Sequence, residues 1–184
     1  MKRRTFLQLA GLTAVSAVNI SLAQEKELPT IKKAVQLSML PKDLSDNDKF
    51  LLARRCGFEG IEAFPMDDLD AARRIGDSAR EKGVPIHSIC YGGWDCPLSD
   101  PNPETVAEGF RKLENALRTA KAVGADTVLL VPAVVTETVR YGEAWDRSHE
   151  NIVKILPLAE ELGIVIAVEN VWNKFLLSPL EFAR

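Results

Sequence analysis

Glycine marks the same point of a recurring pattern along this chain, and that pattern limits the folds the chain can adopt. Four glycines each follow an amphipathic stretch and precede, within three residues, a short run rich in apolar and β-branched residues: Gly57, Gly83, Gly124 and Gly163. Glycine commonly ends helices because it adopts left-handed backbone angles without steric cost. A strand–loop–helix–glycine repeat without hairpin signals favours parallel strands joined by right-handed crossovers.

The repeat predicts five strands and the helices that follow them. We expect strands at residues 34–39, 60–64, 84–90, 127–131 and 164–169. We expect helices from Ser45 to Gly57, from Asp67 or Asp68 to Gly83, from Pro103 to Gly124, from Glu143 to Leu162, and from Ser178 onward. Pro157 should kink the fourth helix because proline removes one of its hydrogen bonds.

Two architectures contain such a sheet, a doubly wound open sheet and a (β/α)8 barrel. The residues after the first strand, Met39-Leu40-Pro41-Lys42, lack the glycine-rich phosphate turn of a dinucleotide fold. The long loops follow strand carboxyl ends, whereas the helix-to-strand turns are short, as in a barrel whose site lies on the carboxyl face. The sequence therefore predicts an α/β fold, a parallel (β/α)8 TIM barrel that is incomplete.

A closed barrel needs eight βα units and typically about 250 residues. We therefore expect the 184 residues to be the first five-eighths of a barrel, and to be inactive on their own. The alternative is a half-barrel that dimerises, and a homo-oligomer remains open in either case.

The N-terminus resembles a twin-arginine export signal over residues 1–23. Arg3 and Arg4 precede Phe6-Leu7, an uncharged stretch follows, and Ser21-Leu22-Ala23 offers small residues for cleavage. We expect cleavage, a periplasmic location and no stable membrane association afterwards. A disordered basic N-terminus and a retained signal-anchor are the alternatives.

The expected mature chain has a linker over residues 24–32 and the barrel portion over residues 33–184. Loss of Lys2, Arg3 and Arg4 takes the formal net charge from −3 to −6. So acidic a chain repels a phosphate backbone unless its cations cluster, and no such cluster stands in the sequence. Nucleic acid is not an expected partner.

The cysteines indicate neither a zinc knot nor a disulfide framework. Cys56, Cys90 and Cys96 are odd in number and have no CxxC spacing. We expect free thiols, with a Cys90–Cys96 disulfide as the alternative.

Acidic side chains stand at the ends of two predicted strands. Glu169 follows five apolar residues, and Glu62 occupies the equivalent place on the second strand. A carboxylate at such a place is costly to bury unless it has a metal, a cation or a proton. Glu169 is therefore the candidate catalytic and metal-binding residue, and Glu62 a candidate substrate contact. The alternatives are an acid that emerges into solvent for Glu169 and an ion pair for Glu62.

Four further residues are candidate substrate contacts. His87 lies inside the third strand, and Trp94 lies in a glycine-rich loop where an aromatic ring could contact a sugar face. Asn173 and Lys174, just past Glu169, could contact a polyol or an anionic group. The alternatives are that His87 is a hydrogen-bonded core residue, that Trp94 packs within a surface loop, and that Lys174 contacts no phosphate. With His87 and His149 as the two histidines, and His149 on a helix, no complete metal site can be assembled from the sequence.

Several segments resemble the xylose isomerase-like TIM-barrel family from about Lys33 onward. They are Gly57-Phe58-Glu59-Gly60-Ile61-Glu62, Val84 to Cys90, Gly124 to Val128, and Val168-Glu169-Asn170-Val171-Trp172-Asn173-Lys174-Phe175. The family includes sugar and sugar-phosphate isomerases, 3-epimerases and apurinic-site endonucleases.

The resemblance implies that Glu169 binds a divalent metal and serves as one acid/base of a pair. The other ligands, an Asp, a His and a Glu, would come from strands six to eight, beyond Arg184. The implied reaction removes a proton beside a carbonyl of a sugar or sugar phosphate, with the enediolate held by Mn²⁺ or Mg²⁺, or alternatively Zn²⁺.

Two departures leave the substrate open. Phe175 and Leu176 stand where ketohexose 3-epimerases of the family have another glutamate, and Gly93-Trp94 stands where several sugar-phosphate members have a histidine. A metal-dependent sugar isomerase or epimerase is the main hypothesis. The alternatives are a non-catalytic carbohydrate-binding barrel and, further off, a metal-dependent phosphodiester hydrolase of the endonuclease branch.

Overall fold

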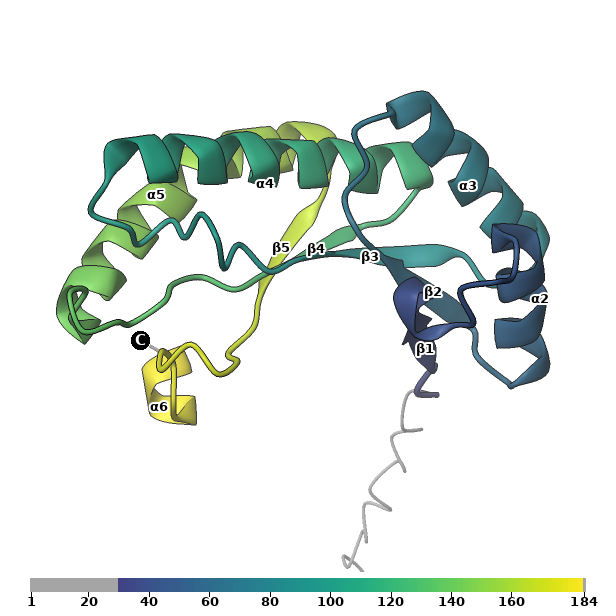
Figure 1. Ribbon diagram of the computed structural model, residues 1–184, viewed down its shortest axis with the longest axis horizontal. Helices are drawn as coiled ribbons and strands as arrows, with labels where there is room; N and C mark the ends of the chain where they lie inside the picture. The colour runs from purple at the N-terminus through teal and green to yellow at the C-terminus, as the bar shows by residue number, and fades with distance from the viewer. Residues whose placement is uncertain (1–29, 184) are drawn as a thin grey trace, which may run out of the picture. The chain divides into compact units, whose positions relative to one another are not determined.

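The computed structural model describes residues 30–183, in which five parallel strands form one sheet in the order β1-β2-β3-β4-β5 (Figure 1). The strands are β1 Ala34–Gln36, β2 Gly60–Ala63, β3 Ile86–Tyr91, β4 Thr127–Leu130 and β5 Val165–Val168. Each strand pairs in parallel with the next along the chain, so every connection crosses over the sheet. The predicted parallel α/β order is confirmed.

Helices connect the strands where the glycine pattern predicts them. They are the 3-10 turn η1 Leu37–Met39 and the helices α2 Asp46–Arg55, α3 Leu69–Glu81, α4 Pro103–Val123, α5 Tyr141–Leu162 and α6 Pro179–Phe182. Ser45 and Asp68 cap α2 and α3 as predicted, since their side chains accept hydrogen bonds from first-turn amides. Gly124 and Gly163 end α4 and α5 with φ of 81° and 68°, which glycine adopts without strain.

The first strand and the fourth long helix differ from their predicted bounds. β1 stops at Gln36 instead of residue 39, because Leu37–Met39 form the 3-10 turn η1, which the Leu40 amide closes by donating to Leu37 O at 3.3 Å. α5 begins at Tyr141, two residues before the predicted Glu143, because the Glu143 carboxylate accepts the Arg140 amide at 2.9 Å and caps the helix there.

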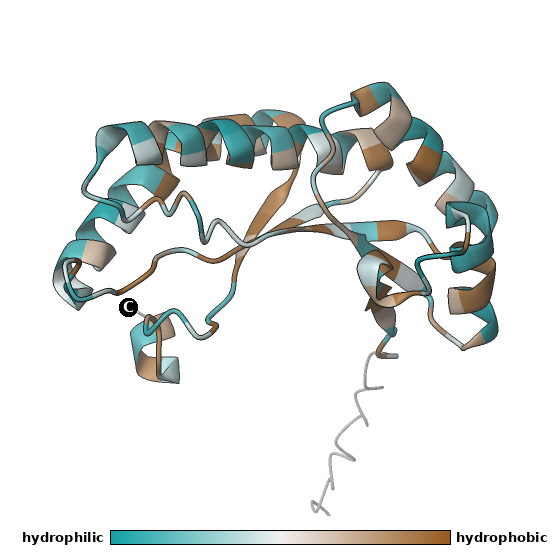
Figure 2. Ribbon diagram, in the orientation of Figure 1, coloured by the Kyte–Doolittle hydropathy of each residue, from teal (hydrophilic) through white to brown (hydrophobic). Residues whose placement is uncertain are grey.

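The helices α2 to α5 lie on one side of the curved sheet (Figure 1). Alternation along the strands directs Ile61, Ile89 and Val128 to this side, and each is fully buried. Figure 2 shows mainly hydrophobic strands beside helices that carry many hydrophilic residues on their visible surfaces. We call the opposite side of the sheet the open face; it carries Gln36 and Glu62.

One glycine sets how closely two helices approach. A Cβ on Gly76 of α3 would lie 2.3 Å from the carbonyl oxygen of Val123 at the end of α4. The two backbones therefore pack in direct contact, which brings the buried Leu113 and Leu117 of α4 against the sheet.

The predicted signal over residues 1–23 lies outside the described residues, as does most of the linker. Among residues 30–183, no helix has the length and apolar character needed to cross a membrane. The three cysteines are free thiols, so the Cys90–Cys96 disulfide is absent here.

Candidate active site

A row of hydrogen-bonded polar side chains crosses the open face. Register places Gln36 beside Glu62 and Glu62 beside Ser88 on three neighbouring strands. Gln36 Nε2 donates to Glu62 Oε2 at 3.4 Å, and Ser88 Oγ donates to Glu62 Oε1 at 3.1 Å. The expected alternative of an ion pair is not what the described residues show, because Glu62 is held by neutral donors. Gln36 and Ser88 were not predicted from the sequence as site residues, although the alternation of side chains along the strands places both on the same face as Glu62.

Glu169 continues the β5 ladder at the carboxyl edge of the sheet. Its backbone N–H donates to Leu130 O at 3.0 Å, and alternation places its side chain on the side opposite to Val168. The strand runs parallel to its neighbour, as expected. Within residues 30–183, the Glu169 side chain is exposed, so the expectation of a buried carboxylate is wrong there. It is exposed because β5 pairs with β4 alone and its other edge is uncovered.

The Cys90 thiol lies within the electrostatic influence of both predicted acids. Burial raises the pKa of Cys90, and the negative charges of Glu62 and Glu169 raise it further, while a hydrogen bond with Gln36 opposes them. Cys90 is half-buried on the open face, between the two carboxylates. The structure thus places Glu62 and Glu169 so that both act electrostatically on the same thiol.

His87 lies away from this carboxyl edge. The register of β2 with β3 shifts between Ile61 and Glu62, which leaves His87 as the extra residue, exposed and beside Gly60 at the start of β2. Its Nε2 lies 3.4 Å from Ser88 Oγ. A substrate contact for His87 stays a prediction, and its place at the amino end of the strands argues against it.

Trp94 lies at the expected edge, in the loop between β3 and α4. Its side chain is 48% exposed and folds back over Gly92, whose hypothetical Cβ would lie 2.8 Å from Trp94 Cδ1. Only glycine at position 92 leaves room for the indole ring in this position. A substrate contact for Trp94 remains open to test.

Asn173 has a different role from the one expected. It is 1% exposed, and its Nδ2 donates to Ala133 O at 2.7 Å. Its Oδ1 accepts from the amides of Val171 and Phe175 at 3.3 and 3.4 Å. With both polar atoms occupied by the backbone, Asn173 ties the loop after β5 to the loop after β4 and offers no exposed atom to a substrate.

Lys174 is exposed, next to Asn173, and has a φ of 58°. This left-handed conformation is unusual for a residue with a side chain. It turns the backbone between Asn173 and Phe175, which are both buried. Lys174 is therefore presented to solvent by its buried neighbours, and its contact with substrate stays a prediction.

The described residues do not form a metal site by themselves. Among residues 30–183, no group of three or more His, Cys, Asp or Glu side chains is placed to hold a metal ion. The nearest acids and thiol, Glu62, Cys90 and Glu169, share the open face without converging on one point. The carboxylate chemistry of Glu169 suits a hard divalent ion, but these residues alone do not fit one.

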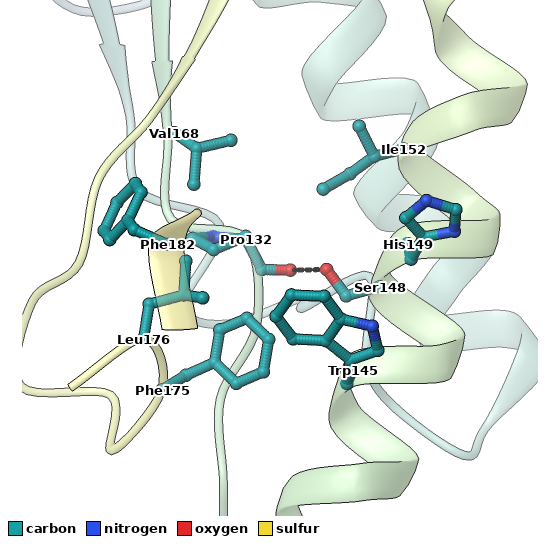
Figure 3. A pocket seen from close by; sticks show the side chains of 9 residues that line it. All are labelled: Pro132, Trp145, Ser148, His149, Ile152, Val168, Phe175, Leu176 and Phe182. Atoms are coloured by element: carbon teal, nitrogen blue, oxygen red, sulfur yellow. Dashed lines mark hydrogen bonds between the residues drawn. The ribbon is translucent and has the colours of Figure 1, made fainter. Parts of the chain in front are cut away.

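An apolar hollow of about 190 Å³ lies on the helix side of the sheet, between α5 and the loop after β5 (Figure 3). Trp145, Ile152, Val168, Phe175 and Phe182 line it, and Ser148 donates to Pro132 O at 2.6 Å within it. His149 lies at its border and is exposed on α5, the helical position predicted for it. Because Val168 and Glu169 face opposite sides, this hollow is separate from the candidate site.

The fold has many relatives among solved structures. A D-psicose 3-epimerase solved with D-fructose has a TM-score of 0.65 and 19% identity, over 77% of this chain and 53% of that one. The 3-keto-D-glucoside 4-epimerase from E. coli has 0.66 and 19%, over 78% and 57%. An L-ribulose 3-epimerase has 0.66 and 18%, over 77% and 50%. The chain thus spans between 50% and 57% of the length of these three proteins, and the likeness shows the fold.

Comparison by sequence gives the family. No curated protein matched the chain. The model of one family, described as xylose isomerase-like TIM barrel, matches residues 50–184, which include four of the five strands and the predicted Glu62 and Glu169. The match covers well over half of the chain and agrees with the parallel sheet and its helices. The chain belongs to the xylose isomerase-like TIM barrel family.

Proposed function

We propose that the protein is a sugar isomerase or epimerase in which Glu169 transfers a proton at the carbon next to a carbonyl. The observation that carries the proposal is the place of Glu169, at the carboxyl end of β5 and on the face that also holds Glu62. Barrels of this kind place their reacting residues at the carboxyl ends of the strands. The sugar epimerases among the structural neighbours support the reaction class.

The open face has the chemistry to hold a polyol. Glu62 is a fixed acceptor, because Gln36 and Ser88 donate to it and orient its carboxylate. A carboxylate has sites for further donors, which sugar hydroxyls supply. We assign Glu62 to hydroxyl binding and Glu169 to proton transfer, since Glu169 is exposed at the edge where a substrate arrives.

Glu169 is also the proposed carboxylate ligand of a divalent cation, Mn²⁺ or Mg²⁺, with Zn²⁺ as the alternative. Such an ion would supply positive charge beside a substrate oxygen. Residues 30–183 do not complete a site for it, so the proton transfer assigned to Glu169 stands on its geometry alone. Residues 1–23 are proposed to export the protein to the periplasm.

The test uses the complete protein expressed from its natural gene, incubated with ketohexoses such as D-fructose and D-tagatose in D₂O. Proton transfer at carbon incorporates deuterium, which NMR detects directly. Glu169→Gln keeps the size of the side chain and removes its basicity, so we expect exchange to fall by about 100-fold or more. Glu161→Gln, at an exposed position of α5, is the matched control and should retain the rate.

Deuterium exchange that survives Glu169→Gln would show that another residue moves the proton. Saturable sugar binding without exchange or interconversion would favour the non-catalytic carbohydrate-binding barrel. Circular dichroism of both variants separates a chemical effect from misfolding.

A further inference from the structure

A second cleft lies between the long loops that follow β3 and β4, and of the candidate site residues it includes Trp94 alone. We call it the loop cleft; its volume is about 490 Å³, and it is lined by Trp94, Asp95, Pro97, Ser99, Asp100, Pro101, Val134, Thr136, Thr138 and Val139. Figure 1 shows both loops leaving the carboxyl ends of their strands in the same direction. Pockets that bind small molecules commonly have volumes of about 300–1,000 Å³.

The walls of the loop cleft are fixed to each other and to α5. The Val134 amide donates to Ser99 Oγ at 3.0 Å, which joins the two loops. Arg147 Nε donates to Ser99 O at 2.8 Å, and Asn151 Nδ2 donates to Leu98 O at 2.8 Å. Asn151 is buried, and Ser99 is fully buried. The cleft is therefore preformed, and a ligand would meet little ordering cost in these walls.

One wall is aromatic. Trp94 is held over Gly92 and keeps nearly half of its surface exposed. Gly93 turns the chain just before Trp94, with a φ of 63°. Pro97, which is partly exposed, adds apolar surface to the lining of the same cleft. A flat aromatic face next to apolar carbons suits the C–H face of a pyranose ring.

The rim is polar and rich in acceptors. Lys112 donates to Asp95 and holds the pKa of that carboxyl below its usual value, so Asp95 is an ionised acceptor. Asp100 accepts the Asn102 amide at 2.7 Å and has further acceptor sites. The Thr136 hydroxyl accepts the Val139 amide at 3.1 Å. Carboxylates and hydroxyls grouped around an aromatic face match the many O–H donors of a saccharide.

We propose that the loop cleft binds a neutral saccharide unit, so that the protein acts on a glycoside whose second ring stacks on Trp94. The loop that forms one wall is joined to the loop after Glu169, because the Val135 amide donates to Asn173 O at 3.0 Å. The loop after β4 therefore connects the cleft to the loop that follows Glu169. This inference rests on the proposed function, which supplies the reaction at the other sugar ring.

The test measures binding of disaccharides, such as maltose, cellobiose and sucrose, to the complete protein by calorimetry. The Glu169→Gln variant serves as the background, so that turnover does not disturb the titration. We expect at least one disaccharide to bind more tightly than its constituent monosaccharides. Trp94→Ala should raise the dissociation constant for that disaccharide about tenfold.

Three further variants make the result specific. Gly92→Ala should weaken disaccharide binding in the same direction, because the new Cβ would displace the indole. Trp94→Phe keeps an aromatic face and should recover part of the affinity. Phe182→Ala, at a site 44% exposed and outside the cleft, is the matched control and should change nothing.

The proposal is overturned if no disaccharide binds better than its monosaccharides, or if Trp94→Ala leaves the affinity unchanged. It is also overturned if choline, a cationic probe for the same aromatic and acidic groups, binds the cleft more tightly than any saccharide. Ketohexose turnover with no disaccharide binding would refute the loop cleft alone. Disaccharide binding through Trp94 without proton exchange by the wild-type protein would refute the proposed function alone.

Discussion

Replacement of Asn173 by alanine tests whether this residue organises the site or contacts the substrate. Asn173 is 1% exposed and makes three hydrogen bonds with backbone groups of two loops. Alanine removes all three and leaves the Ala133 carbonyl and the Phe175 amide without these partners. Both residues are buried, so water replaces the lost bonds poorly.

The expected cost follows from the geometry of these bonds. The bond to Ala133 O, at 2.7 Å, is short and contributes about 1–1.5 kcal/mol net, whereas the two at 3.3 and 3.4 Å contribute less. Unsatisfied buried groups add to the loss. We expect the free energy of unfolding to fall by about 2–4 kcal/mol, a large part of the 5–15 kcal/mol that stabilises a typical domain.

Urea denaturation of the complete protein, followed by circular dichroism, measures this loss. Asn170→Ala is the matched control, because Asn170 is exposed in the same loop, and its cost should stay below about 0.5 kcal/mol. A substrate-binding role makes the opposite prediction, a raised KM with stability unchanged. A loss below about 1 kcal/mol for Asn173→Ala, together with a raised KM, would refute the structural role.

Three other predictions concern packing, pH and export. Gly76→Ala should cost at least about 3 kcal/mol in urea denaturation because its Cβ would lie 2.3 Å from the α4 backbone, whereas Gly142→Ala has no atom within 4 Å and should be near neutral. The pKa of Glu181 is lowered, first by the hydrogen bond from a tyrosine hydroxyl and then by a backbone amide, so its contribution is present above the unfolded pKa and is lost as pH falls through the lowered one. Glu181→Gln should therefore reduce the loss of Tm between about pH 5 and pH 3; an unchanged loss would contradict this contribution. Replacing Arg3 and Arg4 by lysine should leave the uncleaved protein in the cytoplasm, and mass spectrometry of periplasmic and cytoplasmic fractions would show any export that persists.

The order of strands and helices was predictable because it depends on local signals. Helix caps and terminal glycines mark boundaries within a few residues, so Ser45 and Gly124 stand where the structure has them. The early end of β1 was not predictable, since Leu37–Met39 have the composition of a strand but form the 3-10 turn η1. The bulge at His87 likewise arises from the register between two strands, which no single strand reveals.

The candidate site was predictable in its location and less so in its roles. The acids Glu62 and Glu169 were found from their positions at strand ends, which alternation and parallel pairing then bring to one face. The exposure of Glu169 depends on what covers the edge of β5, and this is a tertiary property. The polar row around Glu62 required knowledge of register, because Gln36 and Ser88 lie 26 residues away on either side.

In the loop after Glu169, buried residues anchor the backbone and exposed residues face solvent. Phe175 packs against Tyr141 and Trp145, with ring centroids 5.0 and 5.7 Å away, and Leu176 is buried beside it. These anchors hold the loop although Lys174 and Leu176 have φ of 58° and 55°, each a strain of about 1–3 kcal/mol.

The alternation that results leaves Trp172, 97% exposed, and Lys174 directed outward on either side of the buried Asn173. Asn173, a polar residue predicted to contact a sugar, thus positions its neighbours. Trp172 and Lys174 are therefore exposed on either side of Asn173, and their positions depend on Asn173 remaining intact.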